Sequence, residues 1–172
     1  PYRRQRQMCI RDSLYALLLA LPFALSSCSN DDELPEVNIS VDYSGATEVD
    51  GVYYVVEGEK LNIDAIKVTP KSGYKAATRG ATSYYWNYQF LGTTIVEPFG
   101  ITVDTEGMEP GDYIMQIRST VYQVDRAAGI AYIVLPVKIV DDDHDIPGNG
   151  DEPEEGTINP DSDIRAAVAP TD

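Results

Sequence analysis

Residues 83–91 read Ser-Tyr-Tyr-Trp-Asn-Tyr-Gln-Phe-Leu and show the clearest alternation in the chain. Successive side chains of a strand point to opposite faces, so Tyr84, Trp86, Tyr88 and Phe90 are expected on one face and the residues between them on the other. We predict that residues 83–91 form one strand and that Trp86 lies in the core. The period of two indicates a β fold rather than a helical one.

Similar short runs, separated by turn residues, fill residues 34–140, and no helical period longer than two turns occurs among them. Pro136 lacks an N–H, so the last strand should be an edge or carry a bulge there. Eight strands are enough for two packed sheets, and we predict them at residues 36–43, 52–56, 60–67, 83–91, 93–98, 101–104, 112–123 and 129–140. Two alternating sets are expected to point inward: Tyr113, Met115, Ile117, Ser119 and Val121, and Ile133, Leu135, Val137 and Ile139.

Two motifs connect this pattern to a known family. The chain carries Tyr-Trp-Asn-Tyr at residues 85–88 with Gly-Thr-Thr at 92–94, and Met-Glu-Pro-Gly-Asp-Tyr at 108–113 opens a long run. Residues 37–140 thereby resemble PKD-type immunoglobulin-like domains, in which a W-D-F-G-D-G-like segment precedes a P-G-x-Y strand opener. The resemblance implies an all-β, immunoglobulin-like (PKD-like) β-sandwich. Residues 88–91 replace the family's glycine-rich turn, so a longer connection is expected there.

Composition restricts the chemistry open to this chain of 172 residues. Thirteen Lys and Arg against 28 Asp and Glu give a net charge of −15, which excludes a nucleic-acid partner because phosphate neutralisation needs a basic surface. One His and two Cys are too few for a zinc site or a disulfide framework. Glu57 and Glu59 lie one residue apart on a predicted turn, with no partner residue that could shift their pKa values as acid–base catalysis requires. We therefore expect no enzyme and no cofactor.

The first residues do not look like natural coding sequence. Residues 3–13 read Arg-Arg-Gln-Arg-Gln-Met-Cys-Ile-Arg-Asp-Ser, and the nucleotide string that encodes them in one frame resembles a transposase adapter used for sequencing libraries. We interpret residues 1–13 as an artefact and exclude them from fold reasoning. The alternative is the basic n-region of a signal peptide.

An export signal follows at residues 14–27. Residues 14–25 are almost wholly apolar but too short to cross a bilayer, as expected of a signal-peptide h-region. The next residues, Leu25-Ser26-Ser27-Cys28, resemble the bacterial lipobox, which implies that Cys28 is lipidated and that the protein is attached to the membrane by an N-terminal lipid anchor. The alternatives are an ordinary secretory peptide with a chance cysteine, or a buried helix with a free thiol.

Residues 28–33 form an acidic tether, Ser29-Asn30-Asp31-Asp32-Glu33, directly after this cysteine. An acidic cluster at this position resembles the surface-export signal of Bacteroidetes lipoproteins. It implies an outer-membrane lipoprotein exposed at the cell surface. The alternative is a solvated tether that only keeps the domain off the bilayer.

Residues 141–172 hold eleven acidic residues, one Arg, and repeated Pro and Gly. We predict a disordered acidic linker, because such a segment buries too little apolar surface to offset its ordering entropy. The chain is expected to be truncated here, with a further C-terminal domain missing. A candidate calcium site consists of Asp141, Asp142, Asp143 and Asp145. The glycine-centred spacing of a calcium loop is absent, and a solvated run of charges is the alternative interpretation. His144 has no second His or Cys beside it.

The predicted loop 69–82 contains the candidate ligand-contact residues. Lys71, Lys75 and Arg79 are three of the eight basic residues of the predicted domain, and Tyr74 lies among them. The loop could bind an acidic polysaccharide, be cut after Arg79 by a trypsin-like protease, or be an ordinary exposed loop. Further tyrosines on strand faces are expected to be partly exposed, where they could stack on sugars or pack against cross-strand neighbours: Tyr53, Tyr54, Tyr85, Tyr122 and Tyr132.

These features support one leading hypothesis and two alternatives. The leading one is a lipid-anchored cell-envelope protein whose domain serves as a spacer or as an interaction module for a glycan or an envelope protein. One alternative is a surface glycan-binding lipoprotein of a polysaccharide-utilisation system. The other is a pilus-like structural subunit in which cleavage near Arg79 frees a strand.

Overall fold

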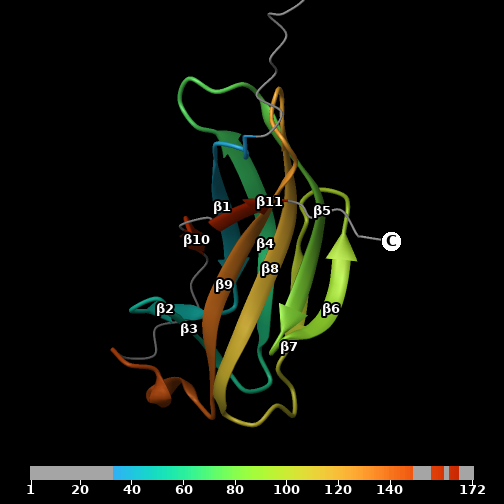
Figure 1. Ribbon diagram of the computed structural model, residues 1–172. Helices are drawn as coiled ribbons and strands as arrows, with labels where there is room; N and C mark the ends of the chain where they lie inside the picture. The colour runs from blue at the N-terminus through green and yellow to red at the C-terminus, as the bar shows by residue number, and fades with distance from the viewer. Residues whose placement is uncertain (1–32, 149–155, 161–162, 167–172) are drawn as a thin grey trace, which may run out of the picture. The chain divides into compact units, whose positions relative to one another are not determined.

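Two β-sheets packed face to face form the part of the chain that the structure describes (Figure 1). The structure is a computed structural model, which describes residues 33–148, 156–160 and 163–166. Its strands are β1 (Val37–Ser44), β2 (Thr47–Val49), β3 (Val52–Val56), β4 (Lys60–Pro70), β5 (Ala77–Trp86), β6 (Gln89–Thr94), β7 (Ile101–Asp104), β8 (Gly111–Gln123), β9 (Gly129–Val140), β10 (Gly156–Ile158) and β11 (Asp163–Ala166). A short 3-10 turn spans Asp143–Asp145.

The order of the strands is that of an immunoglobulin-like sandwich. The smaller sheet runs β10-β1-β4-β7, and the larger runs β2-β3-β9-β8-β5-β6, with β11 also paired to β9. Strands β1, β4 and β7 therefore take the places of strands A, B and E, while β5, β8 and β9 take those of C, F and G. The predicted all-β, immunoglobulin-like fold class is confirmed.

Two side-chain features of this fold are present as well. Trp86, at the end of β5, is only 7% exposed, and its ring stacks on that of Tyr113 with 5.3 Å between centroids. The Tyr113 hydroxyl donates a hydrogen bond to the backbone oxygen of Glu109 at 2.7 Å. This is the tyrosine corner of immunoglobulin-like domains, built near the start of strand F.

The core lies between the sheets and includes the residues predicted to point inward. On β8, Met115 and Ile117 are fully buried, and the two hydroxyls that enter the core satisfy each other, since Thr82 and Ser119 lie 2.8 Å apart. On β9, the four inward residues are all buried, from Ile133 to Ile139. The predicted alternation of the two long strands is therefore confirmed.

The prediction of one strand over residues 83–91 is wrong. β5 ends at Trp86 and β6 begins at Gln89, so Asn87 and Tyr88 form a two-residue hairpin turn with φ of 45° and 66°. Positive φ at both positions is the type I′ geometry, which matches the twist of paired strands. The chain reverses there, and Tyr88 and Phe90 are 69% and 61% exposed instead of continuing the core face. The longer connection expected at this point is also wrong.

Pro136 lies at a local edge of the larger sheet. β9 pairs with β8 from Gly129 to Ile139, but on its other side it pairs with β3 from Val137 onward and with β11 only up to Tyr132. The residues between these two pairings have no partner strand on that side among the described residues. No register shift accompanies Pro136, so the predicted edge is present locally and the predicted bulge is not.

The prediction of a disordered linker throughout residues 141–172 is wrong for two segments. β10 pairs with β1, with Ile158 opposite Val41, and β11 pairs with β9, with Ile164 opposite Ala131. Both isoleucines are partly buried against the core. The prediction of disorder was based on composition. Composition carries no information on whether a short segment can form hydrogen bonds with the open edge of a sheet.

The contact between Asp42 and Thr157 makes the pairing of β10 sensitive to acid. The Lys67 ammonium and the Thr157 hydroxyl, which donates at 2.8 Å, lower the pKa of the Asp42 carboxyl below its ordinary value of 3.8. Stability from these contacts is complete above that value and is lost as the pH falls through the lowered pKa. We predict that Thr157→Val raises the pKa of Asp42, measured by carboxyl NMR titration.

Asp104 provides the control for this titration, because its pKa is lowered by the Glu106 N–H and by Lys60, neither of which contacts Thr157. The pKa of Asp104 should be the same in both proteins. An unchanged pKa for Asp42 in the variant would show that β10 does not dock through this hydroxyl.

Candidate functional site

The four candidate ligand-contact residues occupy two different environments. The loop between β4 and β5 is shorter than predicted, covering residues 71–76, because β4 extends to Pro70 and β5 begins at Ala77. Lys71, Tyr74 and Lys75 lie in this loop, whereas Arg79 lies in β5. The prediction that all four share one polar loop is therefore wrong for Arg79.

Both lysines of the loop already have acidic partners. The Lys71 ammonium lies 2.8 Å from the Glu36 carboxylate, and Lys75 pairs with Asp125 in the hairpin between β8 and β9. Lys71 in turn lowers the pKa of the Glu36 carboxyl. Such exposed pairs contribute little stability, but they leave the loop without the uncompensated positive charge that an acidic polysaccharide would need.

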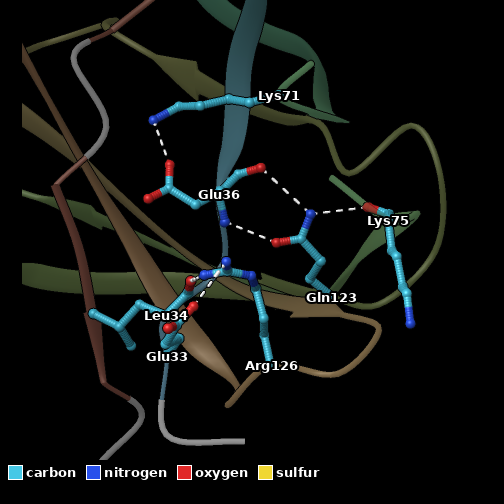
Figure 2. Close-up of polar contacts among 7 residues, drawn as sticks. All are labelled: Glu33, Leu34, Glu36, Lys71, Lys75, Gln123 and Arg126. Atoms are coloured by element: carbon cyan, nitrogen blue, oxygen red, sulfur yellow. Dashed lines mark hydrogen bonds and ion pairs between the residues drawn. The ribbon is translucent and has the colours of Figure 1, made fainter. Parts of the chain in front are cut away.

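The loop holds the segment through which the chain enters the domain, Glu33–Glu36, here called the leading segment (Figure 2). Gln123 lies at the centre of this contact and is only 6% exposed. Its side-chain oxygen accepts from the Glu36 N–H at 2.8 Å, and its amide nitrogen donates to the Lys75 backbone oxygen at 2.9 Å. One buried amide therefore joins the leading segment, β8 and the loop.

Arg126 completes the contact from the β8–β9 hairpin. It donates to the Leu34 backbone oxygen at 2.5 Å and lies 3.0 Å from the Glu33 carboxylate. Its guanidinium also lies over the Tyr74 ring, 4.8 Å from the centroid. Tyr74, although 44% exposed, thus supports Arg126. The predicted ligand-contact residues Lys71, Tyr74 and Lys75 come together here with Gln123 and Arg126, which the sequence analysis did not single out.

We predict that Gln123→Leu lowers the free energy of unfolding by about 1–2 kcal/mol, because the variant leaves the Glu36 N–H without its buried acceptor. Chemical denaturation of both proteins measures the change. Gln89→Leu, on the exposed strand β6, is the matched control and should stay within about 0.5 kcal/mol. Equal effects of the two substitutions would mean that Gln123 does not hold the leading segment.

Arg79 is engaged elsewhere. Its guanidinium lies 2.8 Å from the Glu97 carboxylate and 4.5 Å from the centre of the Phe99 ring, and the side chain is only 14% exposed. Its backbone is paired to Val121 of β8. Proteases cut exposed, flexible segments, so this placement counts against the cleavage after Arg79 that the pilus-like alternative requires.

The candidate calcium residues come together only in part. Asp142, Asp143 and His144 place one ligand atom each within 4.8 Å of one another, all three exposed, and Asp141 and Asp145 do not belong to this group. The Asp142 carboxylate accepts from the His144 N–H at 2.8 Å and so caps the short 3-10 turn. Calcium takes about six to eight oxygen ligands, so this group lacks most of a coordination shell.

The strand tyrosines are not equivalent. Tyr53 is buried at 7% exposure, which contradicts the prediction that it is partly exposed, because it packs edge-on against Tyr43. Burial raises the pKa of Tyr53 to about 12. Tyr85 and Tyr132 lie on the outer face of the larger sheet, but Arg118 lies over both rings, 4.3 Å and 5.6 Å from their centroids. Part of each ring surface is therefore covered by a guanidinium, which leaves less area on which a sugar could stack.

Cys28 and the predicted signal peptide lie outside the described residues. Within the described part of the chain, no helix has the length and apolarity needed to span a membrane.

Comparison with known proteins identifies a similarity to a solved structure. No family model matches the chain, and the search of curated proteins found no match. One solved structure, described as fibronectin(III)-like modules of CbhA from Clostridium thermocellum, is similar over 61% of this chain and 46% of its own length, with 14% sequence identity and a TM-score of 0.35. The assignment of an immunoglobulin-like sandwich rests on the strand connectivity and the side-chain features described above.

Proposed function

We propose that this protein is a lipid-anchored component of the bacterial cell envelope whose immunoglobulin-like domain is an interaction module rather than a spacer. The fold supports the general class, because such sandwiches present large sheet faces to partners and occur as binding or spacer modules. We assign no catalytic activity to the chain. The Glu57 carboxylate, one of the two considered as a candidate acid, accepts from the Gly107 N–H at 2.8 Å and so holds a turn.

The choice between module and spacer depends on where the chain enters and leaves the domain. Gly129 lies between the two segments: a side chain there would come within 2.6 Å of Ile164 in β11 and 2.9 Å of Pro35 in the leading segment. The last residue of β11, Ala166, pairs with Gly129 itself. The chain therefore enters and leaves at the same end, whereas a domain that extends a molecule needs its connections at opposite ends.

The resemblance of residues 25–28 to a lipobox supports the lipid anchor, and an anchor at Cys28 sets the position of this end. Four residues lie between Cys28 and Glu33, and the five steps from one to the other span about 17 Å at most in an extended chain. With Cys28 acylated, the end that carries Gln123 and Arg126 lies close to the membrane. The opposite end, with the β3–β4 and β7–β8 loops, points away from it (Figure 1).

Two measurements test the proposal. Cys28→Ser should move the protein from the membrane fraction to the soluble fraction and abolish labelling by a palmitate analogue, because the variant lacks the thiol that carries the lipid. No helix of the described residues could span a membrane in its place. In a chain with Cys9 and Cys28 replaced by Ser, spin labels at positions 33 and 163 should lie roughly 20 Å apart, and labels at 33 and 106 roughly 40 Å apart. Equal distances would identify a spacer, and continued membrane attachment of the serine variant would exclude the lipid anchor.

A further inference from the structure

A row of stacked side chains crosses the outer face of the larger sheet. The Arg118 guanidinium of β8 lies between Tyr85 of β5 and Tyr132 of β9, and the Arg165 guanidinium of β11 lies on the Tyr132 ring at 4.8 Å. Phe90 of β6 packs against Tyr85, with 5.6 Å between the ring centroids. The set crosses five strands, and rings and cations alternate over the four from β5 to β11. We call this set the arginine–tyrosine row.

Arg118 stands out in this row because it has no acidic partner among the described residues. Arg165 is paired with Asp163 at 2.6 Å, and Arg79 and Arg126 are also paired with carboxylates. No described carboxylate lies within ion-pair distance of Arg118, and its Nε is buried without a hydrogen-bond acceptor. In a chain of net charge −15, an uncompensated arginine held in place by two rings is a site at which a carboxylate would bind.

Gln116, next to Arg118 on the same face, also has a side-chain atom without a hydrogen-bond partner among the described residues. Gln116 precedes Arg118 by two positions on β8, so both side chains point to the outer face. The Gln116 side-chain oxygen is buried and has no donor among the described residues. An unpaired acceptor and an unpaired cationic donor therefore lie side by side on the central strand of the sheet.

The surroundings of these two polar groups are apolar. Phe90 and Val134 are 61% and 56% exposed, and Pro136 and Ile130 lie on the same side of β9 as Val134 and Tyr132. The cross-strand pairs of β8 and β9, from Gln116 opposite Val134 to Thr120 opposite Ile130, include no acidic side chain. The acid nearest this patch on β11, Asp163, lies opposite Tyr132 and is paired with Arg165. Arginine and aromatic residues with few free charges among them are the composition found at the centre of protein interfaces.

We propose that the outer face of the larger sheet binds a protein partner that places an Asp or Glu side chain on Arg118, flanked by apolar side chains that cover Phe90 and Val134. The inference rests on the proposed role as an interaction module and identifies its surface. A sugar ring needs the open face of an aromatic ring, whereas Arg118 lies over the Tyr85 ring, and both Arg118 and Arg165 lie over the Tyr132 ring. A carboxylate needs only the guanidinium edge, which the flanking rings hold in a fixed orientation.

Selection from a random 12-residue peptide library displayed on phage, with the full chain immobilised, tests this inference. Selected peptides are expected to contain an Asp or Glu with apolar residues on either side. For the tightest synthetic peptide, Arg118→Gln should raise Kd at least tenfold, and replacing the peptide's acid by its amide should have a similar effect on the unaltered chain. Lys138→Gln, on the same face of β9 but beside Asp112, is the matched control and should change Kd less than twofold.

Three outcomes would overturn the inference. They are a selection that yields no peptide dependent on Arg118, binding that is equally sensitive to Lys138→Gln, and displacement of the peptide by oligogalacturonate at a lower concentration than by the peptide itself, which would identify an acidic glycan as the ligand. None of these readouts depends on Cys28 or on the spin-label distances. Failure of the surface assignment is therefore distinguishable from failure of the proposed function.

Discussion

Trp86→Ala is expected to lower the free energy of unfolding by about 3–5 kcal/mol, the cost of truncating a buried aromatic side chain. Trp86 fills the space between the sheets at the end of β5 and stacks on Tyr113, whose hydroxyl closes the tyrosine corner. Removal of the indole therefore opens a cavity and also removes the support of a neighbouring ring. Urea denaturation followed by far-UV circular dichroism measures the change without relying on the lost tryptophan signal.

Tyr88→Ala is the matched control, because Tyr88 is only two positions from Trp86 but lies in the hairpin turn and not in β5. Tyr88 is 69% exposed, so its truncation should change stability by about 0.5 kcal/mol or less. A large loss of stability in Tyr88→Ala and a small one in Trp86→Ala would contradict this placement of the turn and of the core face of β5.

Removal of residues 149–172 is expected to lower the free energy of unfolding by about 2–3 kcal/mol. The deletion exposes the apolar surface that Ile158 and Ile164 partly cover, and fully burying one such side chain contributes about 1.5–3 kcal/mol. It also reopens the backbone of β1 and of the first part of β9 as sheet edges. Thermal and chemical denaturation of the full and shortened chains measure the loss.

A point variant separates docking of the tail from an effect of chain length. Ile164→Asn should reproduce part of the loss in the full chain, while Val124→Asn, at a residue 54% exposed, should be nearly neutral. An unchanged unfolding midpoint in the shortened chain would restore the interpretation of residues 141–172 as a plain linker.

The sequence predicted the long strands well because β8 and β9 alternate strictly and are buried on one face. It failed at Asn87 and Tyr88 because a two-residue turn with no glycine leaves the alternation of apolar residues undisturbed on both sides. It failed at β10 and β11 because their docking depends on open edges that only the assembled sheets create. Whether a short polar segment pairs with such an edge is a property of the partner strand.

The candidate site was predicted only in outline. The basic residues of the loop were recognisable, but their ion pairs with Glu36 and Asp125 join positions far apart in the sequence. Gln123 did carry a signal, because it continues the inward phase of β8 two residues after Val121, and a polar residue at an inward position must find hydrogen-bond partners. No signal in the sequence indicated that Arg118 lacks an acidic partner, because its partners depend on which strands lie side by side.

The meeting of the leading segment and β11 at Gly129 has a mechanical consequence. A force that pulls the chain apart at residues 33 and 166 acts on the end of the β9–β11 ladder, so it opens the backbone hydrogen bonds one after another, as a zipper opens, starting at Ala166. Shearing, in which all bonds of a ladder bear the load together, does not arise in this geometry. Once β11 and β10 have peeled away, residues 141–166 become free length on the order of 80 Å, while the two long strands and the core between the sheets remain folded. Under tension, the C-terminal segment thus extends before the rest of the domain unfolds.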